Sequence, residues 1–434
     1  MIDREREGRM QRRVFLGSLA AGALAAGRAS GAEGAKERIR LGVIGCGWYG
    51  GVVLDAAFKA GGVEVVALSD VDSEHLAKTA EKVTGTQGQA PRTFKDYRQL
   101  LDVAGLQAVV IATPPHWHAL PFIEACRRGL DVYCEKPLAY DVREGRAMVE
   151  AAKASGRVVQ VGFQRRQSPA VQKAREYIAA GHAGRIVTVA AQIHYPASAQ
   201  LKDPSPVAPP ASLDWDAWCG PAPKLPYSAQ VGHFSWRLEK AYGNGHLVDW
   251  GIHWIDAIRT VLSLDAPRSV QAAGGLYALR DRITTPDVLS AHFEFDRCPV
   301  TWTHRIFGAA EHSPSTSIGM FFYGEKETVF LTDSLYEIVP VEKGAERRTV
   351  EARGDQQTAH VGEWLEAVRT RGTVSGPPDD AHRSTAAVQL AMVALEAGGR
   401  VDWDPATEAV RENPRAAALL KREYRAPWVH PWKG

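Results

Sequence analysis

The chain has 434 residues, of which 45% are hydrophobic and 24% charged, and its formal net charge is +2 at pH 7. This length predicts two or three domains, and the apolar content suffices for sizeable cores. The near-neutral balance, without a clustered basic face, argues against a nucleic-acid-binding protein. The five cysteines are scattered and lack metal-ligand spacing, so we expect neither a metal site nor a disulfide framework.

Residues 1–32 have the pattern of a targeting segment. Arg12 and Arg13 directly precede a mild apolar run, residues 14–27, which is too short and too rich in glycine and alanine to span a bilayer. The paired arginines resemble the bacterial twin-arginine signal, whose pathway carries folded proteins. We therefore expect export to the periplasm or the cell exterior, with no membrane span in the mature chain. A chance arginine pair in an amphipathic start is the alternative.

The stretch after residue 40 predicts a dinucleotide site. Residues 41–44 have the pattern of a short buried strand, and helix-forming residues occupy 52–59. Between them stand Gly45, Gly47 and Gly50, in the spacing that allows a tight turn, close approach of a diphosphate and close packing of helix on strand. The helix N-terminus would supply free N–H groups and a positive dipole end for the phosphates. A glycine turn without a ligand is the simpler alternative.

The next predicted strand, residues 63–69, ends at Asp70, which stands 25 residues after Gly45. A carboxylate at this distance suits the ribose hydroxyls of NAD, and its charge would repel the 2′-phosphate of NADP. We therefore expect NAD as the cofactor. NADP is the second choice, because Ser69 and Ser73 can soften the discrimination.

Strand and helix patterns then alternate, which favours a parallel sheet with crossover helices. We expect a nucleotide-binding domain over residues 38–163. Its further strands are expected at residues 108–112, 131–134 and 158–163, with a short one at 92–93, and its helices at 74–83, 96–101, 119–128 and 143–154.

Two of these strands end in residues that can reach a ligand, since open α/β sheets bind at the carboxyl ends of their strands. Thr113 and Pro114 follow the strand at 108–112, and His118 comes just after them. His118 can border the cofactor, although a loop or helix-cap role is the plainer interpretation. Glu135 and Lys136 follow the strand at 131–134. Burial there could lower the pKa of Lys136 and allow proton exchange with a substrate hydroxyl. A surface lysine that pairs with Glu135 is the alternative, and composition alone favours it.

A second domain is expected over residues 164–434. It begins with a helix at 169–180 and a strand at 186–195, followed by a proline-rich loop. Tryptophans in the following segment, including Trp236, suit the apolar faces of a sugar ring, or else they pack the loop down. Further strands are expected at 269–277, 288–295, 300–307, 317–323, 328–331 and 335–341, and further helices at 360–371 and 382–398.

A helix over residues 246–263 carries Asp249, His253 and Asp256, which the spacing puts on one helix face. A carboxylate one turn from an imidazole can fix its tautomer and stabilise its protonated form. An ordinary helix with a satisfied histidine is the alternative.

Four motifs together resemble the glucose–fructose oxidoreductase / inositol dehydrogenase / MocA (Gfo/Idh/MocA) family. They occur in the family's order, and the resemblance covers the chain from Arg40 to the C-terminus. The motifs are Gly45-x-Gly47-x-x-Gly50, Thr113-Pro114-Pro115-x-x-His118, Glu135-Lys136-Pro137 and the segment from Asp249 to Asp256. The resemblance implies a Rossmann domain followed by an α/β domain with an open, mostly antiparallel sheet. It also implies hydride transfer between a nicotinamide cofactor and a sugar, polyol or related carbonyl compound, and a cis Lys136–Pro137 bond.

The same resemblance implies a set of site residues. Lys136, Asp249 and His253 match the family's catalytic positions, with Asp249 orienting His253. The residues expected to bind the cofactor are Gly45, Gly47, Trp48, Tyr49, Gly50, Asp70, Thr113, Pro114, His118, Glu135 and Lys136. Those expected to bind the substrate are Lys136, Arg165, Trp236, Asp249 and His253.

The expected activity is therefore that of an exported NAD(H)-dependent oxidoreductase acting on a carbohydrate. Two alternatives remain open. One is a glycosidase that uses bound NAD in a transient oxidation, elimination and reduction cycle. The other is a non-catalytic dinucleotide-binding protein, which the intact set of Lys136, Asp249 and His253 disfavours. We expect a homo-oligomer formed through the sheet of the second domain.

Overall fold

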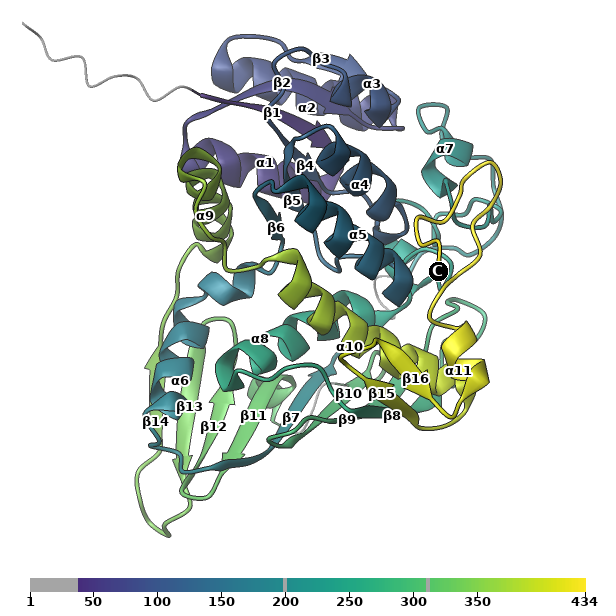
Figure 1. Cartoon of the computed structure of the whole chain (residues 1–434). Helices are drawn as coiled ribbons and strands as arrows, with labels where there is room; N and C mark the ends of the chain where they lie inside the picture. The colour runs from purple at the N-terminus through teal and green to yellow at the C-terminus, as the bar shows by residue number, and fades with distance from the viewer. Residues whose placement is uncertain (1–37, 198–200, 310–312) are drawn as a thin grey trace, which may run out of the picture. The chain divides into compact units, whose positions relative to one another are not determined.

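The computed structural model describes residues 38–197, 201–309 and 313–434 (Figure 1). The expected signal segment, residues 1–32, lies outside the described residues. From Arg38 to Gly434 the chain forms one compact unit that contains two sheets.

The first sheet has six strands in the order β3-β2-β1-β4-β5-β6, and every pairing in it is parallel. Its strands are β1 (Ile39–Ile44), β2 (Val63–Ser69), β3 (Arg92–Phe94), β4 (Ala108–Ile111), β5 (Asp131–Cys134) and β6 (Val159–Val161). The strand order reverses direction between β1 and β4, which is where doubly wound sheets bind dinucleotides. This confirms the Rossmann architecture expected from the sequence.

Helices cross between these strands, and aspartates begin several of them. Asp72, Asp96 and Asp141 cap the helices that follow them, each accepting a backbone N–H, which satisfies donors that a helix start leaves free. The helices are α1 (Trp48–Ala60), α2 (Ser73–Gln87), α3 (Tyr97–Leu101), α4 (Ala119–Arg127) and α5 (Val142–Ser155).

The second sheet has ten strands in the order β14-β13-β12-β11-β7-β10-β9-β8-β15-β16. It is antiparallel except where β7 lies parallel to β10, so the expected mostly antiparallel sheet is confirmed. The strands are β7 (Ile186–His194), β8 (Ser269–Gly275), β9 (Val288–Glu294), β10 (Pro299–Arg305), β11 (Ile318–Gly324), β12 (Glu327–Leu331), β13 (Leu335–Pro340), β14 (Arg348–Glu351), β15 (Val401–Asp404) and β16 (Ala409–Arg411). The sequence did not predict β14, β15 or β16, which are short strands at the two edges.

The helices of the second part of the chain are α6 (Pro169–Ala179), α7 (Trp215–Cys219), α8 (Ile252–Leu262), α9 (Gln356–Thr370), α10 (Pro378–Ala397) and α11 (Pro414–Ala418). A π-helical turn, Leu247–Gly251, leads directly into α8. The residues expected to form one regular helix, 246–263, are therefore wound differently at the start. Short 3₁₀ turns occupy Pro115–Trp117, Gln164–Gln167, Ser235–Leu238 and Pro314–Thr316.

Two late helices return to the first sheet (Figure 1). α9 packs on α1, and its Val361 and Trp364 belong to the same buried cluster as Val53 of α1. α10 contacts both α5 and the strand β8. The Rossmann core is thus completed by residues that follow β6 by 195 positions or more, which holds the two sheets in one unit.

Within the described residues, none of the helices combines the length and the hydropathy that crossing a membrane requires.

Candidate active site

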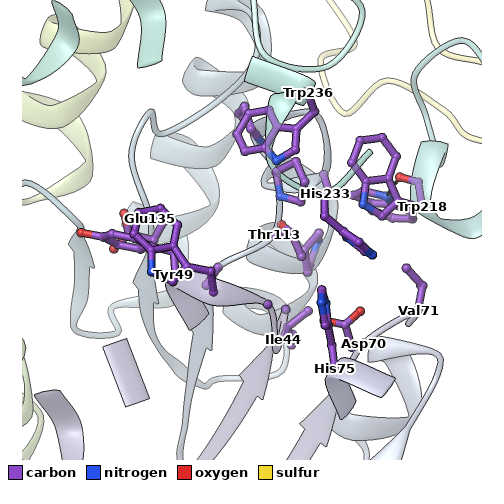
Figure 2. Close-up of a pocket in the computed structure, with 18 of the residues that line it drawn as sticks. Ile44, Tyr49, Asp70, Val71, His75, Thr113, Glu135, Trp218, His233 and Trp236 are labelled. Carbon is purple, nitrogen blue, oxygen red and sulfur yellow. Dashed lines mark hydrogen bonds between the residues drawn. The ribbon is translucent and has the colours of Figure 1, made fainter. Parts of the chain in front are cut away.

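A cavity of about 810 Å³ opens along the carboxyl ends of the Rossmann strands (Figure 2). Its lining comes from the turns after β1, β2, β4 and β5, and from segments of the second domain near residues 217, 236 and 250. A volume of this size is within the usual range for cofactor and ligand sites. The cavity therefore joins the predicted dinucleotide turn to the predicted catalytic helix.

The glycine turn is built as the sequence predicted. Gly45 has a φ of 92°, and a Cβ there would lie 2.8 Å from the backbone of Ala112. A Cβ on Gly50 would lie 2.0 Å from the carbonyl oxygen of Gly45, so only glycine lets α1 approach the turn. Gly47 is different, because it lines the cavity and the nearest atom to an added Cβ is 3.6 Å away on His75. The turn leaves the N-terminus of α1 open for an anion.

Asp70 stands at the carboxyl end of β2, on the cavity wall. Its Oδ2 accepts the backbone N–H of Cys46 at 2.6 Å, and its Oδ1 accepts that of Asp72 at 2.8 Å. Burial raises the pKa of Asp70, while these two hydrogen bonds and the nearby imidazoles act in the opposite direction. A carboxylate oxygen can accept a second donor, so the group retains the capacity to bind ribose hydroxyls.

Most of the other predicted cofactor residues also line the cavity. Thr113, Pro114 and Glu135 do so at the ends of β4 and β5, and Trp48 and Tyr49 do so at the start of α1. The turn, the open helix end and the carboxylate of Asp70 together fit a dinucleotide.

His118 is placed elsewhere, which corrects its predicted role in cofactor binding. It is buried and is not part of the cavity wall. Its Nδ1 lies 2.8 Å from the carbonyl oxygen of Pro137, and its Nε2 lies 2.7 Å from that of Thr113. Burial lowers its pKa to about 4, against the effect of these carbonyl groups. His118 therefore links the turn after β4 to the turn after β5, and holds the cavity wall from behind.

Lys136 and Asp249 form the centre of the site. Lys136 Nζ donates to the Oδ1 and to the backbone carbonyl oxygen of Asp249, at 2.9 Å each. Arg237 Nε lies 3.1 Å from the other carboxylate oxygen. Burial alone would raise the pKa of Asp249, but Lys136 and Arg237 outweigh it and lower the pKa to about 2. Asp249 is thus a permanent anion that holds two cations in place. The peptide bond between Lys136 and Pro137 is cis, as the resemblance implied.

The predicted pairing of Asp249 with His253 is wrong. His253 lines the cavity, but its buried Nδ1 has no hydrogen-bond partner among the described residues. Burial, with Arg165 and Lys136 nearby, holds the pKa of His253 well below its usual value. The physical reason is the π-helical turn, which closes bonds five residues apart and shifts the register in which residues four apart are stacked.

Asp256 is also separated from this face. It forms a buried, two-pronged ion pair with Arg166 and accepts a hydrogen bond from Ser384. Its role is therefore structural, since it ties α8 to the 3₁₀ turn Gln164–Gln167, which precedes α6, and to α10.

The two further residues predicted for the substrate, Arg165 and Trp236, line the same cavity. The guanidinium of Arg165 pairs with Asp333 at 2.5 and 2.8 Å, and its centre lies 4.6 Å from the ring of Trp254. Trp236 is largely buried and lies 4.4 Å beneath the guanidinium of Arg237. Trp236 thus both packs the loop down and lines the cavity.

The sequence did not predict that Arg237 belongs to the site, nor that Glu135 is protonated. Arg237 belongs to no motif, and only the fold brings it to Asp249, although its position next to Trp236 was a weak signal. Glu135 is buried beside Gly162, and burial raises its pKa to about 8, against the opposing effects of Lys136 and Arg237. Near neutral pH this group is mostly protonated.

The chain matches three descriptions of one protein family. Residues 39–163 match the "Oxidoreductase family, NAD-binding Rossmann fold", residues 171–329 the "GFO/IDH/MocA C-terminal domain", and residues 335–430 the "Oxidoreductase family, C-terminal alpha/beta domain". These matches cover both domains of the described chain.

Curated relatives resemble part of the chain. An inositol 2-dehydrogenase from Rubrobacter xylanophilus is 36% identical over 154 residues, 35% of this chain. A levoglucosan dehydrogenase from Pseudarthrobacter phenanthrenivorans is 33% identical over 195 residues, 42% of this chain. In both cases the match spans only 43% of the relative's own length.

A solved structure extends the likeness in fold to nearly the whole described chain. Levoglucosan dehydrogenase in complex with NADH and levoglucosan superposes with a TM-score of 0.66 over 84% of this chain and 99% of that one. The sequence identity is 20%, so this likeness concerns the fold alone. On the three family matches, the chain belongs to the Gfo/Idh/MocA family of oxidoreductases.

Proposed function

We propose that this protein is a dehydrogenase that transfers a hydride between bound NAD(H) and a carbon of a sugar, polyol or sugar derivative. The observation that carries the proposal is the contact of Lys136 with Asp249 in the cavity that also contains the glycine turn. The relatives named as inositol 2-dehydrogenase and levoglucosan dehydrogenase support this substrate class.

The cofactor would be held along the Rossmann strand ends. The turn from Gly45 to Gly50 and the N-terminus of α1 would receive the diphosphate, and Asp70 would accept the ribose hydroxyls. When bound, the nicotinamide ring supplies the hydride acceptor or donor. The residues near Lys136 and His253 line the far part of the same cavity, so the reacting end of the cofactor is expected there.

In the oxidising direction, Lys136 and His253 would handle the hydroxyl proton of the substrate. Lys136 uses two N–H groups on Asp249, which leaves a third for the substrate oxygen and places a positive charge where an alkoxide develops. His253 is neutral because its pKa is held well below the usual value. Since its Nδ1 is buried, Nε2 is the nitrogen that would exchange a proton with the substrate. Asp249 stays ionised throughout and keeps Lys136 oriented.

The test is a panel of sugars and polyols followed by cofactor absorbance and product chromatography in the same samples. Stoichiometric formation of NADH and an oxidised sugar supports the proposal. Release of a sugar without net change in NADH would instead indicate the oxidation–elimination–reduction route. Tight NAD binding without turnover on any compound would indicate a non-catalytic dinucleotide-binding protein.

We further propose that residues 1–32 direct export by the twin-arginine route to the periplasm or cell exterior. The support is the Arg12-Arg13 pair before an apolar run. Replacing both arginines with lysine should trap a fused reporter inside the cell. Equal export of the double-lysine variant would refute this proposal.

Self-association is proposed through the ten-stranded sheet. Helices α6, α8 and α10 pack on one face of this sheet, whereas β11 presents stacked Phe321 and Tyr323 rings, the latter 39% exposed. Light scattering after gel filtration should give a multiple of the subunit mass, and Tyr323→Arg should reduce it. A monomeric wild-type protein would contradict the proposal.

A further inference from the structure

Three potential metal ligands meet at the edge of the cavity, next to Asp70. Asp72, His75 and His233 each offer a ligand atom, and these atoms lie within 4.8 Å of one another. His233 Nε2 is 2.8 Å from Asp72 Oδ2, and the two imidazole rings have centroids 4.3 Å apart. Figure 2 shows His75 and His233 approaching each other from opposite sides of the cavity.

Among the described residues, the carboxylate of Asp72 has no permanently charged cation as a partner, because its one ion-pair partner is the imidazole of His233. Asp72 is 4% exposed, and its partners are the backbone N–H groups of Glu74 and His75, the ring of His233 and the hydroxyl of Ser212. No lysine or arginine in the described part of the chain pairs with it. Buried carboxylates are normally paired with a cation or coordinate a metal.

We propose that Asp72, His75 and His233 bind a divalent transition-metal ion of the Zn²⁺ type. Two imidazoles and a carboxylate are ligands that Zn²⁺ accepts, and oxygen-preferring ions such as Mg²⁺ and Ca²⁺ disfavour this set. In a tetrahedral zinc site the ligand atoms are roughly 3.3 Å apart. His233 Nε2 and Asp72 Oδ2 are 2.8 Å apart and hydrogen-bonded, so these two atoms would move slightly apart when the ion replaces the shared proton. The fourth position faces the cavity, because both imidazoles line it, and water would fill that position.

A second cluster of potential metal ligands differs from this one in its charge. Asp141, Glu144 and His430 are also close enough to share an ion. There, however, Arg422 lies 2.7 Å from Glu144 and its side chain is only 12% exposed, so the carboxylates already have their cation. A metal ion would be repelled by that guanidinium, whereas no guanidinium of the described residues contacts Asp72.

The ion would fasten the second domain to the first. His233 belongs to residues 228–238, whereas Asp72 and His75 lie at the start of α2. The same segment carries Trp236 and Arg237, which line the cavity, and Arg237 pairs with Asp249. Metal binding would therefore hold this segment over the cofactor. This consequence rests on the proposed cofactor binding, whereas the metal site itself does not.

Tag-free mature protein, stripped with a chelator, is titrated with Zn²⁺ by calorimetry. We expect one equivalent to bind, and His75→Gln and His233→Gln to weaken binding by at least about 100-fold, since even loss of an outer partner costs 10–100-fold. Asp72→Asn should weaken it too, while its amide oxygen keeps the helix cap. His182→Gln is the matched control, because His182 is exposed and stacks on Tyr177, away from the three proposed ligands.

Absence of Zn²⁺ binding in the wild-type protein would overturn the proposal. So would unchanged binding in the His75 and His233 variants, or equally tight binding of Mg²⁺ or Ca²⁺. Stopped-flow displacement of NADH tests the consequence separately. Zn²⁺ should slow NADH release in the wild type and in His182→Gln but not in His233→Gln, and an equal effect in all three would refute the fastening role.

Discussion

Lys136 donates two hydrogen bonds to Asp249, one to its carboxylate and one to its backbone carbonyl, although the residues are 113 positions apart. The lysine follows a strand of the Rossmann sheet, and the aspartate lies in a π-helical turn of the second domain. The direction of the lysine therefore depends on how the two sheets are joined. Arg237 holds the other carboxylate oxygen, so a single anion organises two cations beside the cavity.

The first prediction concerns Asp249→Asn, which should destabilise the protein at pH 7 because it leaves Lys136 and Arg237 without their anion. The pKa of Asp249 is lowered to about 2 in the folded state, below an unfolded value of about 3.9. Its stabilising charge is thus complete above pH 4 and is lost as the pH falls from about 4 to about 2. The difference in melting temperature between the two proteins should shrink over that window. A constant difference from pH 2 to 6 would contradict the ion-pair account.

The second prediction concerns Glu135, whose pKa is raised to about 8 in the folded state. The unfolded chain releases this proton above about pH 4.3, whereas the folded protein holds it up to about pH 8. The free energy of unfolding therefore falls as the pH rises between these two values. Glu135→Gln, measured without cofactor, should become progressively more stable than wild type between pH 5 and 8. Glu81→Gln, at an exposed position, should show no such trend. Parallel stability curves for Glu135→Gln and wild type would refute the prediction.

The third prediction compares two neighbouring glycines in α1. Gly50→Ala should abolish NADH binding and destabilise the domain, because its Cβ would meet the carbonyl oxygen of Gly45. Gly51→Ala is the matched control, since its Cβ would meet nothing within 4 Å. Alanine in a helix interior is favoured over glycine by about 1 kcal/mol, so this variant should be slightly more stable. Fluorescence titration with NADH and thermal unfolding measure both effects, and intact NADH binding in Gly50→Ala would contradict the packing role.

The fourth prediction is that the protein binds NAD(H) more tightly than NADP(H), because Asp70 accepts ribose hydroxyls and repels a 2′-phosphate. Asp70→Asn should narrow this preference mainly by improving NADP(H) binding. Calorimetry on cofactor-stripped protein measures both affinities. Tighter NADP(H) binding by the wild-type protein would overturn the assignment of Asp70.

Local patterns predicted the Rossmann half well. Residues 63–69 and 131–134 coincide with β2 and β5, because continuous apolar runs bounded by turns are a strong signal for buried parallel strands. The sequence did not predict the edge strands β14 and β16, because they are short and little buried. Within the site, the glycine turn and Lys136 could be placed because each follows a predicted strand.

Other features of the site depend on contacts that no local pattern encodes. The spacing of Asp249 and His253 predicts neighbours on an α-helix, but the π-helical turn redirects Asp249 to Lys136 and Arg237. His118 belongs to a motif near the cofactor, yet its ring bonds two carbonyls behind the cavity wall. Both differences arise from tertiary packing, which decides where a side chain of known type finds its partners.

We expect Lys136 and His253 to act together on the substrate proton, and single-turnover hydride transfer with a competent sugar measures this joint action. Lys136→Ala and His253→Ala should each slow transfer by roughly 10²–10⁴, the usual size of an acid–base contribution. Both variants should retain most of their NADH affinity, because the glycine turn and Asp70, which would hold the diphosphate and the ribose, are unchanged and Lys136 would touch only the reacting end of the cofactor. The double variant should lose much less than the product of the two effects, since groups that act as a unit are not additive. His182→Ala serves as the control. A near-normal transfer rate in either single variant would contradict the account and remove that residue from the mechanism.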